Sequence, residues 1–213
     1  MHMQTPSAGQ LLVFREQLLK FVTFTDEQWA LFSEHLYLKQ LRKKELFVPA
    51  GKVCSEIGFM LSGSTRIFFV KDGIEISSYF CFELDLITSY ASFLKRQPSL
   101  VSIEAMEDSA LICFSCEGLH RMMEDPRLVF PLEHMGRLIA EYLICCYEER
   151  VMSFLSQSPE ERYRYILQSA PGLLQRIPQH HIANYLGVTP VSLSRIRKRI
   201  VTGKASGRSA LSA

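Results

Sequence analysis

The chain has 213 residues, of which 47% are hydrophobic and 22% are charged, the composition of an ordinary globular protein with one good core or two modest ones. No run of 18 apolar residues occurs, and the first residues lack the basic and apolar regions of a signal peptide, so neither a membrane span nor secretion is expected. The six cysteines are accordingly expected to be reduced thiols in a cytoplasmic protein.

The net charge of +2 hides two parts of opposite charge. No Asp or Glu follows Glu161, and the last 52 residues carry nine Lys or Arg, whereas the first 161 hold 15 basic and 22 acidic residues, which gives −7 against +9. A compact segment at +9 repels itself, and a polyanionic partner is the simplest reason for that charge. The sequence therefore predicts a nucleic-acid-binding part on the end of a larger acidic domain.

The first two thirds of the chain read as two short helices followed by many short strands. Residues 10–20 have helical apolar spacing, and Thr25 is an expected N-cap of a second helix through about Leu36. Asp72-Gly73 marks the clearest hairpin, because both residues favour the positive φ values of a tight turn. The predicted strands begin near Leu46, Ile57, Arg66, Ile74, Val101 and Ser109. This spacing predicts a sandwich or a jelly-roll barrel.

A short helix is expected over 117–123 and a long one from about Arg127 to Leu155. Six residues of the long helix step by four and three, which predicts a dimer seam: Leu128, Leu132, Met135, Ile139, Tyr142 and Cys146. A second apolar face carries Leu138, Ile144, Tyr147, Val151 and Leu155. A helix with two apolar faces can pack both on its own domain and on a second copy; the alternative is one wide core face in a monomer.

The basic segment contains the pattern of a helix-turn-helix. Ser158 and Pro159 start a helix, and two further short helices flank Gly187, with Thr189 as N-cap and Pro190 at the first position of the last helix. The expected inner faces hold Ile182, Ala183, Leu186, Leu193, Ile196 and Ile200. The tail after Thr202 is expected to be unstructured, so any β wing is reduced or missing.

The outward positions of the last helix are typical of a recognition helix, with short side chains near its start for base edges and cations further along for phosphates. Arg195 is the best candidate for a bidentate contact with guanine. The full predicted set is Thr189, Val191, Ser192, Ser194, Arg195, Arg197, Lys198 and Arg199, with Gln179 and His180 from the preceding helix. The alternative is a surface helical hairpin with a solvated basic face.

These residues carry a resemblance to the CRP/FNR transcription regulators (the cyclic-AMP receptor protein and fumarate-nitrate-reductase regulator types). The matching segments are Ile177-Pro-Gln179, Tyr185-Leu-Gly187, Thr189-Pro190, Leu193-Ser-Arg195, Glu161-Arg-Tyr163 and Leu61-Ser-Gly63 with Arg66. The resemblance covers about residues 10–200. It implies an α+β protein with a double-stranded β-helix sensor domain (1–125), a dimerisation helix (126–156) and a helix-turn-helix domain with a reduced winged-helix form (157–213).

The resemblance further implies a bacterial, non-enzymatic, homodimeric transcription regulator that binds palindromic double-stranded DNA, with RNA polymerase and an unidentified small-molecule effector as partners. One departure is Val191, which stands where the family usually has a glutamate that accepts from a cytosine amino group. Valine cannot accept a hydrogen bond but can contact a thymine methyl, so a shifted base preference is expected.

A second departure concerns the effector. Cyclic-nucleotide members of the family carry a Gly-Glu pair and, about ten residues on, an arginine for the cyclic phosphate; Thr88-Ser89 and Pro98 stand at these places. Without the charge-assisted contact, cyclic AMP is not expected to bind tightly. Another anion in a non-standard pocket stays an alternative. The candidate pocket residues are Ser89, Tyr90, Lys95, Arg96 and Ser99.

No cofactor or metal is expected. Cys113 and Cys116 have CxxC spacing, but no cysteine precedes Cys54, so the N-terminal cysteine cluster of the iron–sulfur regulators is missing, and buried inert thiols are favoured over redox sensing. Cys145 and Cys146 are expected to pack within the helix bundle. A cupin-like enzyme is disfavoured because residues 46–114 contain no histidine. A module for RNA or anionic membranes is disfavoured because the basic helix lacks interleaved aromatic residues.

Overall fold

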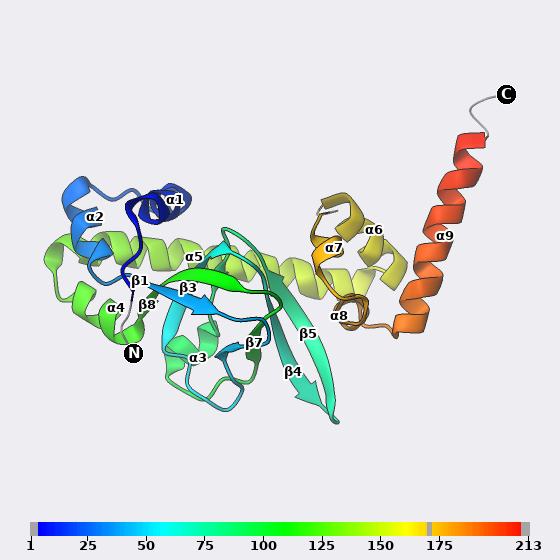
Figure 1. The fold of residues 1–213 in the computed structure, drawn as a ribbon, viewed down its shortest axis with the longest axis horizontal. Helices are drawn as coiled ribbons and strands as arrows, with labels where there is room; N and C mark the ends of the chain where they lie inside the picture. The colour runs from blue at the N-terminus through cyan, green and yellow to red at the C-terminus, as the bar shows by residue number, and fades with distance from the viewer. Residues whose placement is uncertain (1–3, 170–171, 210–213) are drawn as a thin grey trace. The chain divides into compact units, whose positions relative to one another are not determined.

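The computed structural model describes residues 4–169 and 172–209, with the side chains of Leu173 and of residues 203–209 left aside. Its elements combine antiparallel strands with helices, as predicted (Figure 1). The chain forms two compact units, one of Met1–Val70 with Ser78–Tyr147 and one of Lys71–Ser77 with Glu148–Ala213. No helix within the described ranges is long and apolar enough to cross a membrane.

Two antiparallel four-stranded sheets lie in the first unit, except for the hairpin at 71–77, which belongs to the second. One has the order β1-β8-β3-β6 and the other β2-β7-β4-β5. The first sheet comprises β1 (Tyr37–Leu41), β8 (Ser109–Ser115), β3 (Glu56–Ser62) and β6 (Leu86–Ile87). The second comprises β2 (Leu46–Val48), β7 (Ser102–Ala105), β4 (Thr65–Lys71) and β5 (Ile74–Cys81). The predicted hairpin is confirmed, since Asp72 and Gly73 have φ values of 52° and 75°, while β1 and β6 were not predicted.

Alternation along β8 shows how the barrel is filled. Leu111 and Cys113 point into the space between the sheets, whereas Ile112 and Phe114 pack on the outer face. The interior is tight at Gly58, where an added Cβ would lie 2.9 Å from Leu111 Cδ2 and 3.3 Å from Cys113 Sγ. The predicted double-stranded β-helix is thus a packed core rather than an open cup at this position.

Helices cover the outer face of the first sheet. They are α1 (Ala8–Leu18), α2 (Asp26–Ser33), α4 (Cys116–Met123) and the first part of α5 (Pro126–Ser156). Thr25 caps α2 as predicted, with Gln28 completing a capping box. The Phe14 and Phe59 rings, with centroids 4.8 Å apart, join α1 to the sheet.

Burial contradicts three of the six residues predicted for the dimer seam on α5. Leu128, Leu132 and Met135 are buried in this same core, and Leu128 is only 1% exposed, so they cannot face a second copy. Ile139 is half-buried against the core, Tyr142 is exposed with its ring 6.2 Å from that of Phe21, and Cys146 is half-buried. The physical reason is that apolar spacing identifies an apolar face of a helix but not what covers it. On the second apolar face Ile144, Tyr147, Val151 and Leu155 are exposed, as are Phe130, Tyr142, Met152 and Phe154 elsewhere on α5.

The second unit contains the C-terminal part of α5 followed by α6 (Pro159–Ser169), α7 (Leu173–Arg176), α8 (Gln179–Leu186) and α9 (Pro190–Ser209). Ser158 caps α6 as predicted, since its hydroxyl accepts from Glu161 N at 3.3 Å. Every regular element of residues 148–169 and 172–209 is helical, and no wing strand occurs there.

The expectation of an unstructured tail after Thr202 is wrong, because α9 continues through Ser209. Glycines at 203 and 207 suggested a break in the helix. Each glycine weakens a helix interior by about 1 kcal/mol relative to alanine, but neither ends a helix outright, and no proline follows to do so.

Candidate nucleic-acid interface

The turn between α8 and α9 depends on Gly187. Its φ of 72° and ψ of 32° lie in the left-handed region, and Val188 N donates to Ala183 O at 2.9 Å, which closes a helix C-cap. An added Cβ at Gly187 would also lie 3.3 Å from Phe154 Cε1. The left-handed conformation therefore favours glycine here, and a Cβ would in addition crowd the Phe154 ring of α5.

Thr189 starts α9. Its hydroxyl accepts a hydrogen bond from Ser192 N at 3.2 Å and donates to Ser192 Oγ at 3.0 Å, and its carbonyl accepts from Leu193 N at 3.0 Å. Pro190 occupies the first helical position, where no N–H is needed. The cap fixes the direction in which the first turn of α9 leaves the glycine turn.

Burial separates the two faces of the helix-turn-helix as predicted. The apolar positions of α8 and α9 are all buried: Ile182, Ala183, Leu186, Leu193, Ile196 and Ile200. On the outward side, Val191 is 62% exposed and Ser194 and Arg195 are exposed, while Ser192 is half-buried through its bond to Thr189. The structure thus presents a short row of small side chains and one guanidinium at the start of α9.

The cations further along α9 differ from one another. Arg197 and Lys198 are exposed, whereas Arg199 pairs with Glu160 of α6 through Nε at 3.0 Å and Nη2 at 2.8 Å. Glu160 also accepts from Arg164 Nη2 at 2.9 Å. Hydrogen bonds from Arg164 and then Arg199 hold the pKa of Glu160 below its usual value. Gln179 and His180 are exposed at the start of α8, and the His180 ring lies 3.9 Å from that of His181.

Two arginines beneath the turn were not predicted as functional. Arg162 is 7% exposed, and its Nη2 donates to Leu186 O at 2.8 Å. Arg150 Nη2 donates to Tyr185 O at 2.5 Å, and its guanidinium lies 3.5 Å from the centroid of the Tyr185 ring. The only signal for them in the sequence is that Arg162 lies in the Glu161-Arg-Tyr163 segment, which carried the resemblance but no role.

The predicted effector residues differ from one another in burial. They lie on and around α3 (Tyr90–Lys95), a helix that was not predicted. The Ser89 and Ser99 hydroxyls are both buried and lie 2.9 Å apart, bonded to each other. Arg96 Nη1 donates to Cys54 O at 2.8 Å, Tyr90 is half-buried, and Lys95 is exposed. Ser89 and Ser99 are thus bonded within the chain, Arg96 is exposed with its Nη1 bonded to backbone, and Phe93 of α3 fills the barrel core.

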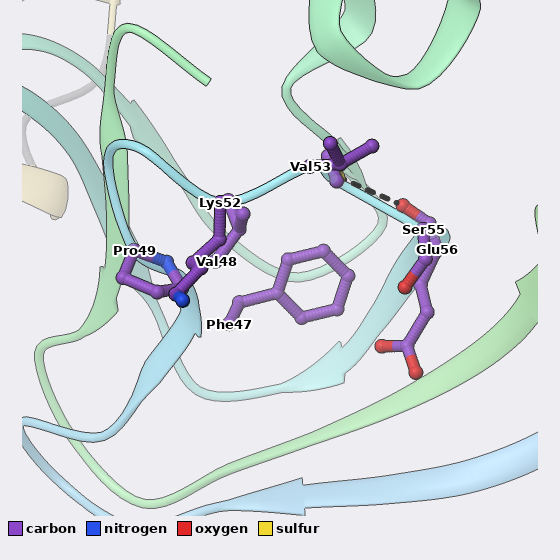
Figure 2. Close-up of a pocket in the computed structure, with 8 residues that line it drawn as sticks. Phe47, Val48, Pro49, Lys52, Val53, Ser55 and Glu56 are labelled. Carbon is purple, nitrogen blue, oxygen red and sulfur yellow. Dashed lines mark hydrogen bonds between the residues drawn. The ribbon is translucent and has the colours of Figure 1, made fainter. Parts of the chain in front are cut away.

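Two cavities occur elsewhere in the barrel domain. One, of about 80 Å³, lies along the segment from Phe47 to Glu56 (Figure 2). It is much smaller than the roughly 300 Å³ at which ligand pockets begin. The second, of about 330 Å³, is lined by residues from Gln40 to Arg42, Ser62, and Asp108 to Ala110. Neither is lined by any of the five predicted effector residues.

Four of the six cysteines are buried, namely Cys54, Cys81, Cys113 and Cys116. Burial raises the pKa of Cys81 to about 12 and that of Cys113 further, so both stay protonated thiols, in line with the prediction of inert core groups. Cys145 is exposed, which corrects the expectation that it packs within the helices. Among the described residues, no group of three or more His, Cys, Asp or Glu side chains could hold a metal ion.

No family model and no curated protein matches the chain. Solved structures do match. CLP from Xanthomonas campestris, described as a c-di-GMP-responsive global regulator, is 14% identical, with 84% of this chain and 93% of that chain covered at a TM-score of 0.66. FixK2 from Bradyrhizobium japonicum is 18% identical, with 79% and 86% covered at a TM-score of 0.65.

A putative transcriptional regulator of the CRP/FNR family from Eubacterium rectale is 20% identical, with 84% of this chain and 85% of that chain covered at a TM-score of 0.61. In all three comparisons the match extends over most of both chains. The chain therefore has the fold of the CRP/FNR transcription regulators.

Proposed function

We propose that the protein is a cytoplasmic transcription regulator of the CRP/FNR type that binds duplex DNA through α9. The observation that carries the proposal is the split of α9 into a buried apolar face and an outward face with Val191, Ser194 and Arg195 at its start and Arg197 and Lys198 beyond. A helix with this arrangement fits the major groove, with its first turns at base edges and its later cations at phosphates. Further contacts with DNA come from Thr189 and Ser192 at the start of α9 and from Gln179 and His180 at the start of α8.

The regulator acts as a homodimer on a palindrome whose half-sites are about one helical turn apart. The exposed apolar side chains of α5, Ile144, Tyr147, Val151 and Leu155, support this, because they recur at steps of three and four residues on a helix of 31 residues. They replace Leu128, Leu132 and Met135 as the proposed seam. RNA polymerase is the further partner expected of such a regulator.

The protein is not an enzyme in this proposal, and cyclic AMP is not its effector. The interior of the barrel is filled by apolar side chains such as Phe93, Ile103 and Leu111. The polar groups of Ser89 and Ser99 are bonded to each other. Arg96 is held by backbone carbonyls of Cys54 and Phe93. An effector, if the protein uses one, therefore binds elsewhere than at these residues.

Titration of duplex DNA at several salt concentrations tests the proposal. Arg195→Ala should weaken binding to a selected site by about 1–3 kcal/mol and relax the preference at one base. Lys198→Ala should weaken binding to all sequences alike and lower the salt slope by about one. The matched control is Arg121→Ala, which removes an exposed arginine of α4 that pairs with Glu117. Equal losses for all three variants would overturn the assignment of α9.

A further inference from the structure

The end of the long helix and the turn of the helix-turn-helix share one buried guanidinium. Arg162, from the first turn of α6, donates through Nη1 to Gln157 O at 2.5 Å and Ser153 O at 3.4 Å, and through Nη2 to Leu186 O at 2.8 Å. Ser153 and Gln157 carry carbonyls at the end of α5, and Leu186 is the last residue of α8. One side chain therefore caps the C-terminal ends of two helices.

The last carbonyls of a helix have no partner within the helix and carry partial negative charge, so a cation is favourable there. The positive charge of Arg162 faces these carbonyls and the Phe154 ring, which lies 4.6 Å from its guanidinium carbon. A planar guanidinium can reach several acceptors in fixed directions, which an ammonium group cannot. The contact is therefore specific in geometry.

A second arginine completes the arrangement. Arg150 of α5 donates to Tyr185 O, so the two final carbonyls of α8 are each bonded to a guanidinium. Its guanidinium lies 4.3 Å from the Phe154 ring, and the same ring would be the nearest neighbour of a Cβ at Gly187. Arg150, Phe154 and Arg162 thus form a cluster, here named the arginine cap, directly beneath the turn that sets the direction of α9.

We propose that the arginine cap is a positioning device: Arg162, assisted by Arg150, fixes the helix-turn-helix against the end of α5, and thereby sets the angle at which α9 is presented. Neither arginine needs to contact DNA for this role. The effect of the arginine cap on DNA binding rests on the function proposed above. The coupling of α5 to the turn does not depend on that function.

Residue-resolved amide hydrogen exchange tests the coupling without DNA. In Arg162→Met, the Gln157 amide, which donates to Ser153 O, and the Val188 amide, which donates to Ala183 O, should both exchange at least about tenfold faster. The Leu193 amide in α9 should keep its rate. A variant that only destabilises the unit would speed all three amides together, and a rise at one end alone would contradict a shared cap.

Arg162→Lys and Arg150→Met serve as milder variants in case the first does not fold. Lysine keeps the charge but cannot span the three carbonyls, so Arg162→Lys should fall between wild type and Arg162→Met. Arg150→Met should speed exchange at Val188 but not at Gln157. Arg164→Met is the matched control, because Arg164 lies on the same helix and pairs with the Glu160 carboxylate rather than with carbonyls. Unchanged exchange in all Arg162 variants would overturn the proposal.

The DNA measurement then asks whether the coupling positions α9. Well below the melting temperature, Arg162→Met should lose at least about tenfold in affinity for a selected palindrome, with non-specific affinity and salt slope unchanged. A reduced salt slope would instead make Arg162 a phosphate contact, and unchanged specific affinity would make the cap only structural; either result contradicts the proposal. If the wild-type protein binds no DNA, the proposed function fails, and hydrogen exchange still decides the coupling.

Discussion

The Ser99 hydroxyl lies 2.9 Å from the Ser89 hydroxyl, and this bond joins the two ends of the segment that carries α3. Ser99 Oγ also lies 2.6 Å from Val101 O and 3.2 Å from Val101 N. The two buried serines are therefore part of the folded barrel. The segment expected to hold an effector is instead closed by this bond.

Cyclic AMP is accordingly expected to leave the thermal stability of the protein unchanged. A ligand present at 100 times its dissociation constant stabilises the native state by about 2.7 kcal/mol, which calorimetry or fluorescence melting detects easily. A melting temperature that rises with cyclic AMP concentration would contradict the closed segment. The same titration with other nucleotides distinguishes a changed specificity from a site that binds none.

Gly58→Ala should destabilise the barrel by about 1–3 kcal/mol, because the new Cβ would lie within 3.3 Å of Leu111, Cys113 and Phe47 side chains. Gly136→Ala is the matched control. Its Cβ would meet nothing within 4 Å inside a helix, so it should stabilise the chain by about 0.5–1 kcal/mol. Urea unfolding measures both. A neutral Gly58→Ala would show that the barrel interior has room to spare.

The two faces of α5 should respond differently to substitution. Val151→Glu places a charge on the exposed apolar face and should yield monomers in sedimentation experiments without a large loss of stability. Leu128→Ala removes a side chain that is 1% exposed and should cost about 2–5 kcal/mol, with the oligomeric state unchanged. Monomers from Leu128→Ala, or unaltered dimers from Val151→Glu, would restore the seam first predicted from the sequence.

Asp125 gives a pH-dependent contribution at the start of α5. Its hydrogen bonds with the side chain and backbone N–H of Arg127 hold the pKa of this carboxyl at about 2, below the ordinary 3.8. A carboxyl whose pKa is lowered on folding stabilises the folded state at pH values above its ordinary pKa. This contribution to stability is lost as the pH falls towards 2. The difference in stability between wild type and Asp125→Asn should therefore shrink between pH 4 and pH 2, as pH-dependent unfolding would show. A constant difference would contradict the assignment.

The sequence predicted those elements whose signals are local. Thr25, Ser158 and Thr189 cap helices as expected, and Asp72-Gly73 forms the hairpin, because caps and tight turns depend on a few neighbouring residues. The face of α5 that packs on the core was predicted to contact a second copy of the chain. The reason is that two apolar faces on one helix have the same periodicity. Only the position of Phe14, Phe32 and Phe59 in the fold shows which face is covered within the chain.

The buried and outward faces of α9 were also predicted correctly, since these positions follow from the helical period once the cap is placed. The arginine cap was not predicted. Arg150 and Arg162 lie 35 and 24 residues from the α8 carbonyls that they bind, and nothing in a local pattern distinguishes them from surface arginines. The closed Ser89–Ser99 segment was missed for a related reason, because its bond spans a helix that the sequence did not reveal.

Selection of bound sequences from random duplex DNA, with wild type and Val191→Glu in parallel, tests the central claim most directly. Both proteins should enrich a palindrome with half-sites about one helical turn apart. The two consensus sequences should differ at one symmetric base pair, where glutamate can accept from a cytosine amino group and valine cannot. Salt-sensitive binding with no enriched palindrome, or identical consensus sequences for both proteins, would contradict the assignment of α9 as the DNA-reading helix.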